Sequence, residues 1–142
     1  MNSQDETQDK DIVVNAANAG NFTTLTNALK TADLVATYKG IGPYTFFAPT
    51  DEAFKKLPGD ELAVLLGDKA MLTSVINYHV IKGKVRGKDI RARESLSIQG
   101  QSLKIASNDG GYTVNGAKVS KHEINSVNGV IHPIDTVMKP KQ

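Results

Sequence analysis

The sequence predicts an α+β fold, because helical and strand patterns occupy separate parts of the chain. Apolar residues recur at helical spacing up to about residue 79, and from residue 80 onward they alternate with polar residues. An aromatic-rich stretch, residues 44–48, predicts one early strand among the helices. The length of 142 residues fits one domain. We expect residues 1–10 to form a flexible acidic tail and residues 11–140 to form the domain.

Capping and breaking residues delimit the expected helices. Asp11 predicts the N-cap of a short helix that Gly20 ends. A second helix carries a single apolar stripe, formed by Leu25, Ala28, Leu29 and Ala32. Three more helices are expected, one after the N-cap Thr50, one over residues 60–66 and one after Asp68. The last of these has one apolar face, which consists of Leu72, Val75, Ile76 and His79.

The alternating region predicts a meander of short strands. Residues 95–99 and 103–105 form a hairpin pattern around Gly100-Gln101. Further turns are expected at residues 108–111 and at Asn128-Gly129, before a final strand that follows Gly129. Pro133 cannot donate to a ladder, so that strand should lie at an edge or be bulged there.

Composition excludes several classes of site. The chain has no cysteine, which rules out disulfides, zinc–thiolate sites, iron–sulfur clusters and thiol nucleophiles. The 17 basic and 15 acidic residues give a net charge of +2, so nothing argues for nucleic acid as a partner. No apolar run approaches the roughly 20 residues of a transmembrane helix. The first residues are polar and do not resemble a signal peptide, which leaves a cytosolic protein or a mature exported segment.

No pattern of catalytic or metal-binding residues is present. The histidines His79, His122 and His132 lack a spacing typical of metal sites, and there is no G-x-S-x-G motif. Gly40-x-Gly42 precedes a strand rather than a helix, so it does not form a phosphate loop. We therefore expect no metal, no cofactor and no enzymatic activity, and an enzyme or small-ligand carrier is the weakest alternative.

Four ordered motifs resemble the fasciclin-domain family. Residues 42–54 (GPYTFFAPTDEAF) and 128–135 (NGVIHPID) match its two boxes, Tyr78-His79 matches its Tyr-His motif, and residues 19–25 fit its opening. The resemblance implies a wedge of two β-sheets with several helices along one side. It also implies an extracellular, periplasmic or cell-surface location. The implied role is adhesion through a cell-surface or extracellular matrix protein, without catalysis. A single domain without cysteine fits a bacterial or archaeal member and, we expect, a monomer.

The sequence departs from the family pattern at two places. Pro133 stands where the family usually has an aliphatic residue, so the resemblance predicts a distortion of the last strand there. Animal matrix members carry an Asp-Ile integrin-binding motif shortly before the second box, and Glu123-Ile124 occupies the matching position here. The carboxylate is retained on a side chain one methylene longer, which puts integrin binding in doubt. Glu123 and Ile124 remain candidates for adhesion.

Several motif residues have a structural interpretation beside the functional one. Tyr78 and His79 are adhesion candidates by resemblance, but His79 continues an apolar helical stripe, which favours a core residue bonded to backbone. Thr50 and Asp51 are expected to cap a helix and to interact favourably with its dipole. Asp135 lies in an apolar strand and should accept hydrogen bonds, because an unpaired buried carboxylate is expensive. The remaining framework candidates lie in the second box and are Asn128, Gly129 and His132.

A basic stretch over residues 82–93 is not a family hallmark. Six basic residues against the single acid Asp89 give it a local charge of +5. If residues 82–88 are extended, four of the cations share one face. Binding of an anionic polysaccharide is therefore the alternative function, whereas the simpler interpretation is a solvated strand edge that deters pairing. The six residues are Lys82, Lys84, Arg86, Lys88, Arg91 and Arg93.

Overall fold

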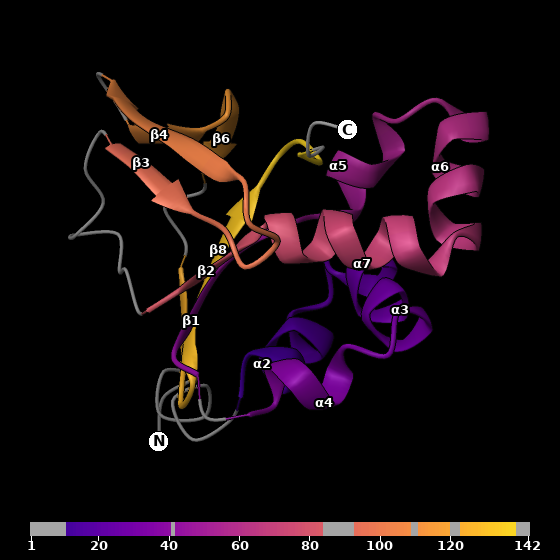
Figure 1. The fold of residues 1–142 in the computed structure, drawn as a ribbon, viewed down its shortest axis with the longest axis horizontal. Helices are drawn as coiled ribbons and strands as arrows, with labels where there is room; N and C mark the ends of the chain where they lie inside the picture. Colours follow the sequence, from indigo (N-terminus) through magenta and orange to yellow (C-terminus); the bar gives the residue numbers. More distant parts are fainter. Residues whose placement is uncertain (1–10, 41, 84–92, 109–110, 120–122, 139–142) are drawn as a thin grey trace.

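The computed structural model describes residues 11–40, 42–83, 93–108, 111–119 and 123–138. The expected tail, residues 1–10, lies outside this range. Helices and one strand occupy the first half, and short strands fill the second half, which confirms the predicted α+β class (Figure 1). The helices are α2 (Ile12–Ala19), α3 (Thr23–Thr31), α4 (Val35–Tyr38), α5 (Asp51–Lys55), α6 (Gly59–Gly67) and α7 (Lys69–Tyr78). The strands are β1 (Tyr44–Pro49), β2 (Val80–Lys82), β3 (Arg93–Leu96), β4 (Ser102–Asn108), β5 (Gly111–Val114), β6 (Ala117–Val119), β7 (Ile124–Ser126) and β8 (Gly129–Ile134).

The predicted capping signals set the helix boundaries. The Val14 N–H donates to the Asp11 carboxylate at 2.9 Å, and Gly20 ends α2 with a φ of 86°. The Asp68 carboxylate begins α7 in the same way, by accepting from the Met71 N–H at 3.1 Å. Helix α4 was not predicted, because its four residues are too few for a periodic pattern and its N-cap makes no side-chain hydrogen bond.

The strands form one strongly bent sheet with two halves. Strand order is β2-β1-β8-β6-β5-β4-β3, and β7 also pairs with β8. Strands β1 and β8 run parallel, and the other pairs are antiparallel. The halves meet at the pair Val119–Ile134 and at an isolated bridge between Ile81 and Ser97. These two halves correspond to the two β-sheets of the wedge that the family resemblance implies.

Strand β8 corrects the expectation attached to Pro133. The strand is not at an edge, because β1 pairs with one side of it, and β7 and β6 pair with the other. Strand β7 reaches Ile131 and β6 reaches Ile134, so neither is paired with Pro133 among the described residues. Pro133 lies where β7 has ended and β6 has not yet begun to pair, so its missing N–H leaves no ladder hydrogen bond unmade on that side.

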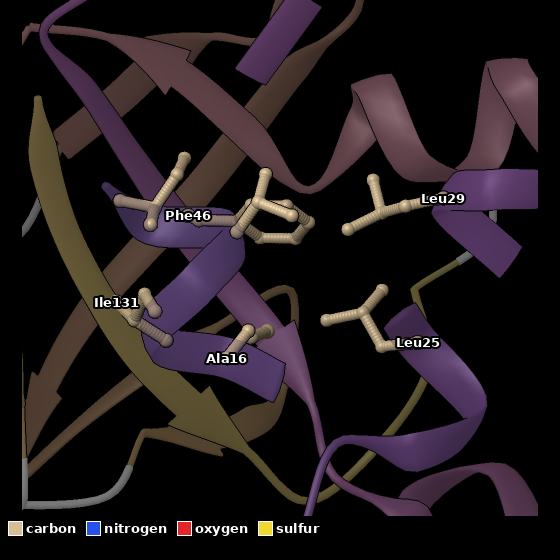
Figure 2. A pocket seen from close by; sticks show the side chains of 8 residues that line it. Ala16, Leu25, Leu29, Phe46 and Ile131 are labelled. Atoms are coloured by element: carbon tan, nitrogen blue, oxygen red, sulfur yellow. The ribbon is translucent and has the colours of Figure 1, made fainter. Parts of the chain in front are cut away.

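Two hydrophobic cores lie on opposite faces of β1 and β8. Phe46 packs with the helices, whereas its neighbour Phe47 packs with the meander, as side-chain alternation along a strand requires. Figure 2 shows Phe46 and Ile131 pointing toward Leu25 and Leu29 of α3. The space between these apolar side chains leaves no room for a water molecule. The helical side of the sheet is therefore a packed core.

The predicted β3–β4 hairpin is present, but the apolar residues before its turn face outward, whereas Leu103 and Ile105 of β4 are buried. Leu96 is 65% exposed and Ile98 is 40% exposed, whereas Ser97 between them is buried. The Ser97 hydroxyl donates to the Gln101 carbonyl at 2.6 Å, which satisfies it inside the turn. Apolar and polar residues thus alternate here as predicted, but the polar Ser97 and not the apolar residues faces the interior.

Candidate functional site

Asn128 joins three segments of the first half to the second box. Its Oδ1 accepts from the Ile12 N–H at 2.9 Å, and its Nδ2 donates to the carbonyls of Tyr38 and Gly40, both at 2.8 Å. Its own carbonyl accepts from the Tyr44 N–H at 2.9 Å. These bonds tie the start of α2, the end of α4 and the start of β1 to one buried residue. The expected turn lies one residue earlier than predicted, at Val127-Asn128, because Gly129 already begins β8, and its asparagine is a structural hub.

Gly129 allows the two boxes to approach closely. It pairs with Tyr44 at the start of the parallel β1–β8 ladder. A Cβ atom at Gly129 would lie 2.0 Å from the Tyr44 carbonyl oxygen, a contact that no side chain can make without moving a strand. Glycine is therefore required here by the distance between the two strands.

Thr50 and Asp51 connect α5 to α3. The Thr50 hydroxyl caps α5 by accepting from the Ala53 N–H at 3.3 Å, as the sequence predicts. The Asp51 carboxylate accepts from the Thr24 N–H at 2.8 Å, in the first turn of α3. Burial would raise the pKa of Asp51, but hydrogen bonds from Thr24 and Thr23 outweigh it and hold this pKa below its usual value. Asp51 thus lies in the first turn of α5 and also accepts a hydrogen bond from the first turn of α3.

Tyr78 and His79 lie inside the molecule. Tyr78 is 6% exposed and His79 is 1% exposed. The His79 Nδ1 lies 2.7 Å from the Val75 carbonyl, so it carries the proton, and Nε2 accepts from the Met138 N–H at 2.9 Å. Burial lowers the pKa of His79 to about 4, against the smaller opposing effect of the Val75 bond. The Tyr78 hydroxyl accepts from Asn115 Nδ2 at 2.7 Å.

His132 and Asp135 differ in burial. His132 is 1% exposed and its ring stacks on Phe47 with centroids 5.6 Å apart. Asp135 was expected within the strand and buried, but β8 ends at Ile134 and the Asp135 side chain is 45% exposed. It accepts from the Lys118 N–H at 2.9 Å and from the Thr136 hydroxyl at 3.1 Å, in agreement with the expected acceptor role. Burial would raise the pKa of Asp135, but these bonds outweigh it and hold the pKa below its usual value.

Glu123 and Ile124 line a surface groove of about 560 Å³. The end of β8 and the start of α5 line the groove, and the α2–α3 turn, β6 and the start of β7 complete its walls. Its apolar lining comes from Phe22, Val119, Ile124, Pro133 and Ile134. Its charged lining comes from Glu52, Lys118, Glu123 and Asp135. The structure thus brings Asp135 and the Glu123-Ile124 pair to one surface and leaves Tyr78-His79 away from it.

The family model for the fasciclin domain matches residues 20–140. The chain belongs to the fasciclin-domain family. It is 40% identical over 131 residues to Protein sll1483 of Synechocystis sp., a match that covers 91% of this chain and 73% of that protein. It is 39% identical over 120 residues to Transforming growth factor-beta-induced protein ig-h3 of Sus scrofa, covering 84% of this chain and 18% of that protein.

The fold also matches a solved structure. A FAS1 domain pair from the insect cell adhesion molecule Fasciclin I superposes with a TM-score of 0.76 at 15% identity, over 94% of this chain and 52% of that chain. The description of that solved structure calls Fasciclin I a cell adhesion molecule, and at 15% identity the likeness shows the fold alone. This chain spans less than a fifth of ig-h3, so the family match supplies the fold, and the role and partner of this chain are separate questions.

Most of the basic stretch falls outside the described residues of this fasciclin domain. Lys84, Arg86, Lys88 and Arg91 are not described, and of Arg93 only the backbone in β3 is. Lys82 is exposed at the end of β2. The expected extended conformation over residues 82–88 is therefore described only as far as Gly83.

Within the described part of the chain, no group of three His, Asp or Glu side chains is placed to hold a metal ion. No described helix is both long and apolar enough to cross a membrane.

Sequence patterns did not identify the groove, because its walls come from five separate segments. Residues 19–22, 50–52, 118–119, 123–124 and 133–135 meet only in the folded chain. The usable signal was the family pair Glu123-Ile124, which lies in one of these segments. The hub role of Asn128 was also missed, since an Asn-Gly dipeptide predicts a turn and says nothing of distant partners.

Proposed function

We propose that this chain is an extracellular, periplasmic or cell-surface adhesion module that binds another protein through the groove lined by Glu123 and Ile124. The observation that carries the proposal is the accessibility of this pair beside the burial of Tyr78 and His79. Residues 11–140 act as one monomeric domain without catalytic activity. The rigid framework made by Asn128 and Gly129 holds the groove in shape, as a binding surface on a fixed scaffold requires.

A pull-down from intact cell envelopes or extracellular matrix tests this function. The chain is immobilised, and the matrix is presented untreated, after protease digestion or after polysaccharide digestion. We expect capture to be lost after protease digestion and retained after polysaccharide digestion. The variant Glu123→Lys should weaken capture, because it reverses a charge that lines the groove. Absence of capture from every untreated matrix would contradict an adhesive role.

Polyanion binding through the basic stretch is the second candidate. It is favoured by the local charge of +5 and by the exposed Lys82. It predicts salt-sensitive retention on a heparin-like resin, and loss of that retention in the variant Lys84→Glu/Arg86→Glu. In the pull-down, capture abolished by polysaccharide digestion and by this double variant, but not by Glu123→Lys, would favour the second candidate over the first.

A further inference from the structure

Four large apolar side chains are exposed among the described residues, and two of them share one face. Leu96 is 65% exposed and Ile98 is 40% exposed, and they lie at the end of β3 and in the turn that follows it. The other two, Val64 of α6 and Val127 of the β7–β8 turn, belong to separate elements. Single exposed apolar residues are normal, whereas neighbouring ones form an apolar patch, which is typical of an interaction site.

Strand β4 extends this face with an exposed lysine. Leu96 pairs with Ser102, and Lys104 lies two residues further along β4 on the same face. Ser102 and Lys104 are exposed, whereas Leu103 between them is fully buried on the opposite face. Glu94, the acid of β3, stands opposite Lys104 in the ladder. The Lys104 ammonium forms no ion pair with a described side chain.

Strand β2 places a second exposed lysine on the other side of Leu96. Ile81 bridges Ser97 in antiparallel register, so Lys82 and Leu96 are the next residues on these two strands. Lys82 is exposed and, within the described part of the chain, has no ion-pair partner. The sequence adds charge of the same sign, since residues 82–93 carry a local charge of +5. We define the β3 face as Lys82, Leu96, Ile98, Ser102 and Lys104.

We propose that the β3 face binds the surface of an anionic lipid bilayer. Leu96 and Ile98 enter the interfacial region between headgroups and acyl chains. The ammonium groups of Lys82 and Lys104 contact lipid phosphates. A bilayer fits both features of the face, because its surface offers negative charge beside apolar material. An anionic polysaccharide offers the charge alone, and the exposed aliphatic side chains would then stay in water.

The β3 face is separate from the groove of the proposed adhesive function. None of its five residues lines the groove. Binding to a bilayer therefore adds a second interaction to the molecule, and it does not depend on the adhesive function. The vesicle experiment and the matrix pull-down test different side chains.

Co-sedimentation of the full chain with vesicles tests the proposal. One set of vesicles consists of phosphatidylcholine, and the other of equal parts phosphatidylcholine and phosphatidylglycerol. We expect binding to the anionic vesicles alone, and this binding should weaken with added salt. The double variant Leu96→Ser/Ile98→Ser should lower the partition coefficient by about tenfold, because two aliphatic side chains no longer leave water. Lys82→Gln/Lys104→Gln should lower it by a similar factor, because two cations are lost at the surface.

Val64→Ser/Val127→Ser is the matched control. It also removes two exposed aliphatic side chains, but from elements outside the β3 face. Strand β3 and helix α6 lie toward opposite ends of the molecule (Figure 1). The control variant should therefore bind the anionic vesicles as the wild type does. Thermal unfolding of each variant verifies that it is folded.

The proposal is overturned if the chain binds both kinds of vesicle alike or neither kind, or if Leu96→Ser/Ile98→Ser partitions as the wild type does. Retention on a heparin-like resin that is unchanged in this variant, without vesicle binding, would assign the cations to a polysaccharide. Vesicle binding together with a failed pull-down would contradict the adhesive function alone. A successful pull-down without vesicle binding would contradict the bilayer proposal alone.

Discussion

Tyr78 and His79 are 6% and 1% exposed, whereas Glu123 and Ile124 are half-buried and line a groove on the surface. Both pairs are adhesion candidates that the resemblance to family motifs predicts. His79 uses both ring nitrogens on backbone groups, one in α7 and one at Met138. A change at His79 therefore alters the packing of the molecule before it alters any surface. Burial therefore makes Tyr78-His79 part of the framework, whereas Glu123-Ile124 is placed where a partner could reach it.

The largest expected effect concerns Asn128, which belongs to the framework. Asn128→Ala leaves the Ile12 N–H and the carbonyls of Tyr38 and Gly40 without their side-chain partner. Each buried group left unsatisfied costs about 1–3 kcal/mol, so we expect the free energy of unfolding to fall by about 4 kcal/mol. Urea denaturation measures this change.

Asn125→Ala is the matched control for Asn128→Ala. Asn125 lies in neighbouring β7, and its Oδ1 has no hydrogen-bond partner among the described residues. Its loss should cost less than about 1 kcal/mol. Equal destabilisation by the two variants would show that the hydrogen bonds of Asn128 are not what holds the framework.

The next effect is a pH dependence of stability caused by His79. Burial lowers the pKa of His79 to about 4, and in the unfolded chain it returns to about 6.5. Between these values the unfolded chain binds a proton that the folded chain does not, so the free energy of unfolding falls as the pH drops from 6.5 to 4. The loss amounts to about 3 kcal/mol. Urea denaturation at half-unit pH steps measures it.

Imidazole nitrogen shifts provide an independent check on His79. They should show a neutral ring with the proton on Nδ1 down to about pH 5, because Val75 accepts from that nitrogen. A His79 ring that titrates near pH 6.5 in the folded protein would contradict the buried assignment. Titration of the Asp51 and Asp135 carboxyls does not account for a loss of stability between pH 6.5 and 4. Their pKa values are lowered, so the stability that they contribute is lost below about pH 4.

Sequence patterns predicted the elements of the framework well. The caps at Asp11 and Thr50 are local signals that depend on three or four residues, and each operates as expected. Asp68, after which a helix was expected, caps α7 in the same way. Of the two alternatives expected at Pro133, an edge position or a bulge, the edge position is wrong, because a proline is also tolerated where one partner strand ends before the next begins. Strand β7 was missed since three residues are too short for a period-two pattern.

The binding surface could be predicted much less well than the framework. A groove forms where segments that are distant in the sequence meet in the folded chain. Alternation along a strand shows which residues share a face, but it does not show which of the two faces is buried. Leu96 and Ile98 illustrate this, since the apolar members of that pattern are the exposed ones. The pair Glu123-Ile124 was found by family resemblance, not from its local chemistry.

A smaller effect is expected at the cap of α5. Thr50→Ala removes the acceptor for the Ala53 N–H and should lower the free energy of unfolding by about 1 kcal/mol. Thr50→Ser keeps the hydroxyl and should retain most of that stability. Thermal unfolding of the three proteins measures the difference. Because Thr50 also lines the groove, equal stability of Thr50→Ala and the wild type would assign this residue to the surface and not to the framework.

The smallest effect on stability is expected at Glu123, and it sharpens the comparison most. Glu123→Gln keeps the size of a half-buried side chain and removes its charge, so the free energy of unfolding should change by less than about 0.5 kcal/mol. Capture from matrix should nevertheless weaken, because the charge contributes to binding and not to folding. His79→Gln should do the reverse and lower stability at neutral pH, since glutamine cannot reproduce both backbone bonds in the same geometry. If Glu123→Gln destabilised the fold as strongly as His79→Gln, both pairs would be framework, and the adhesive surface would lie elsewhere on the molecule.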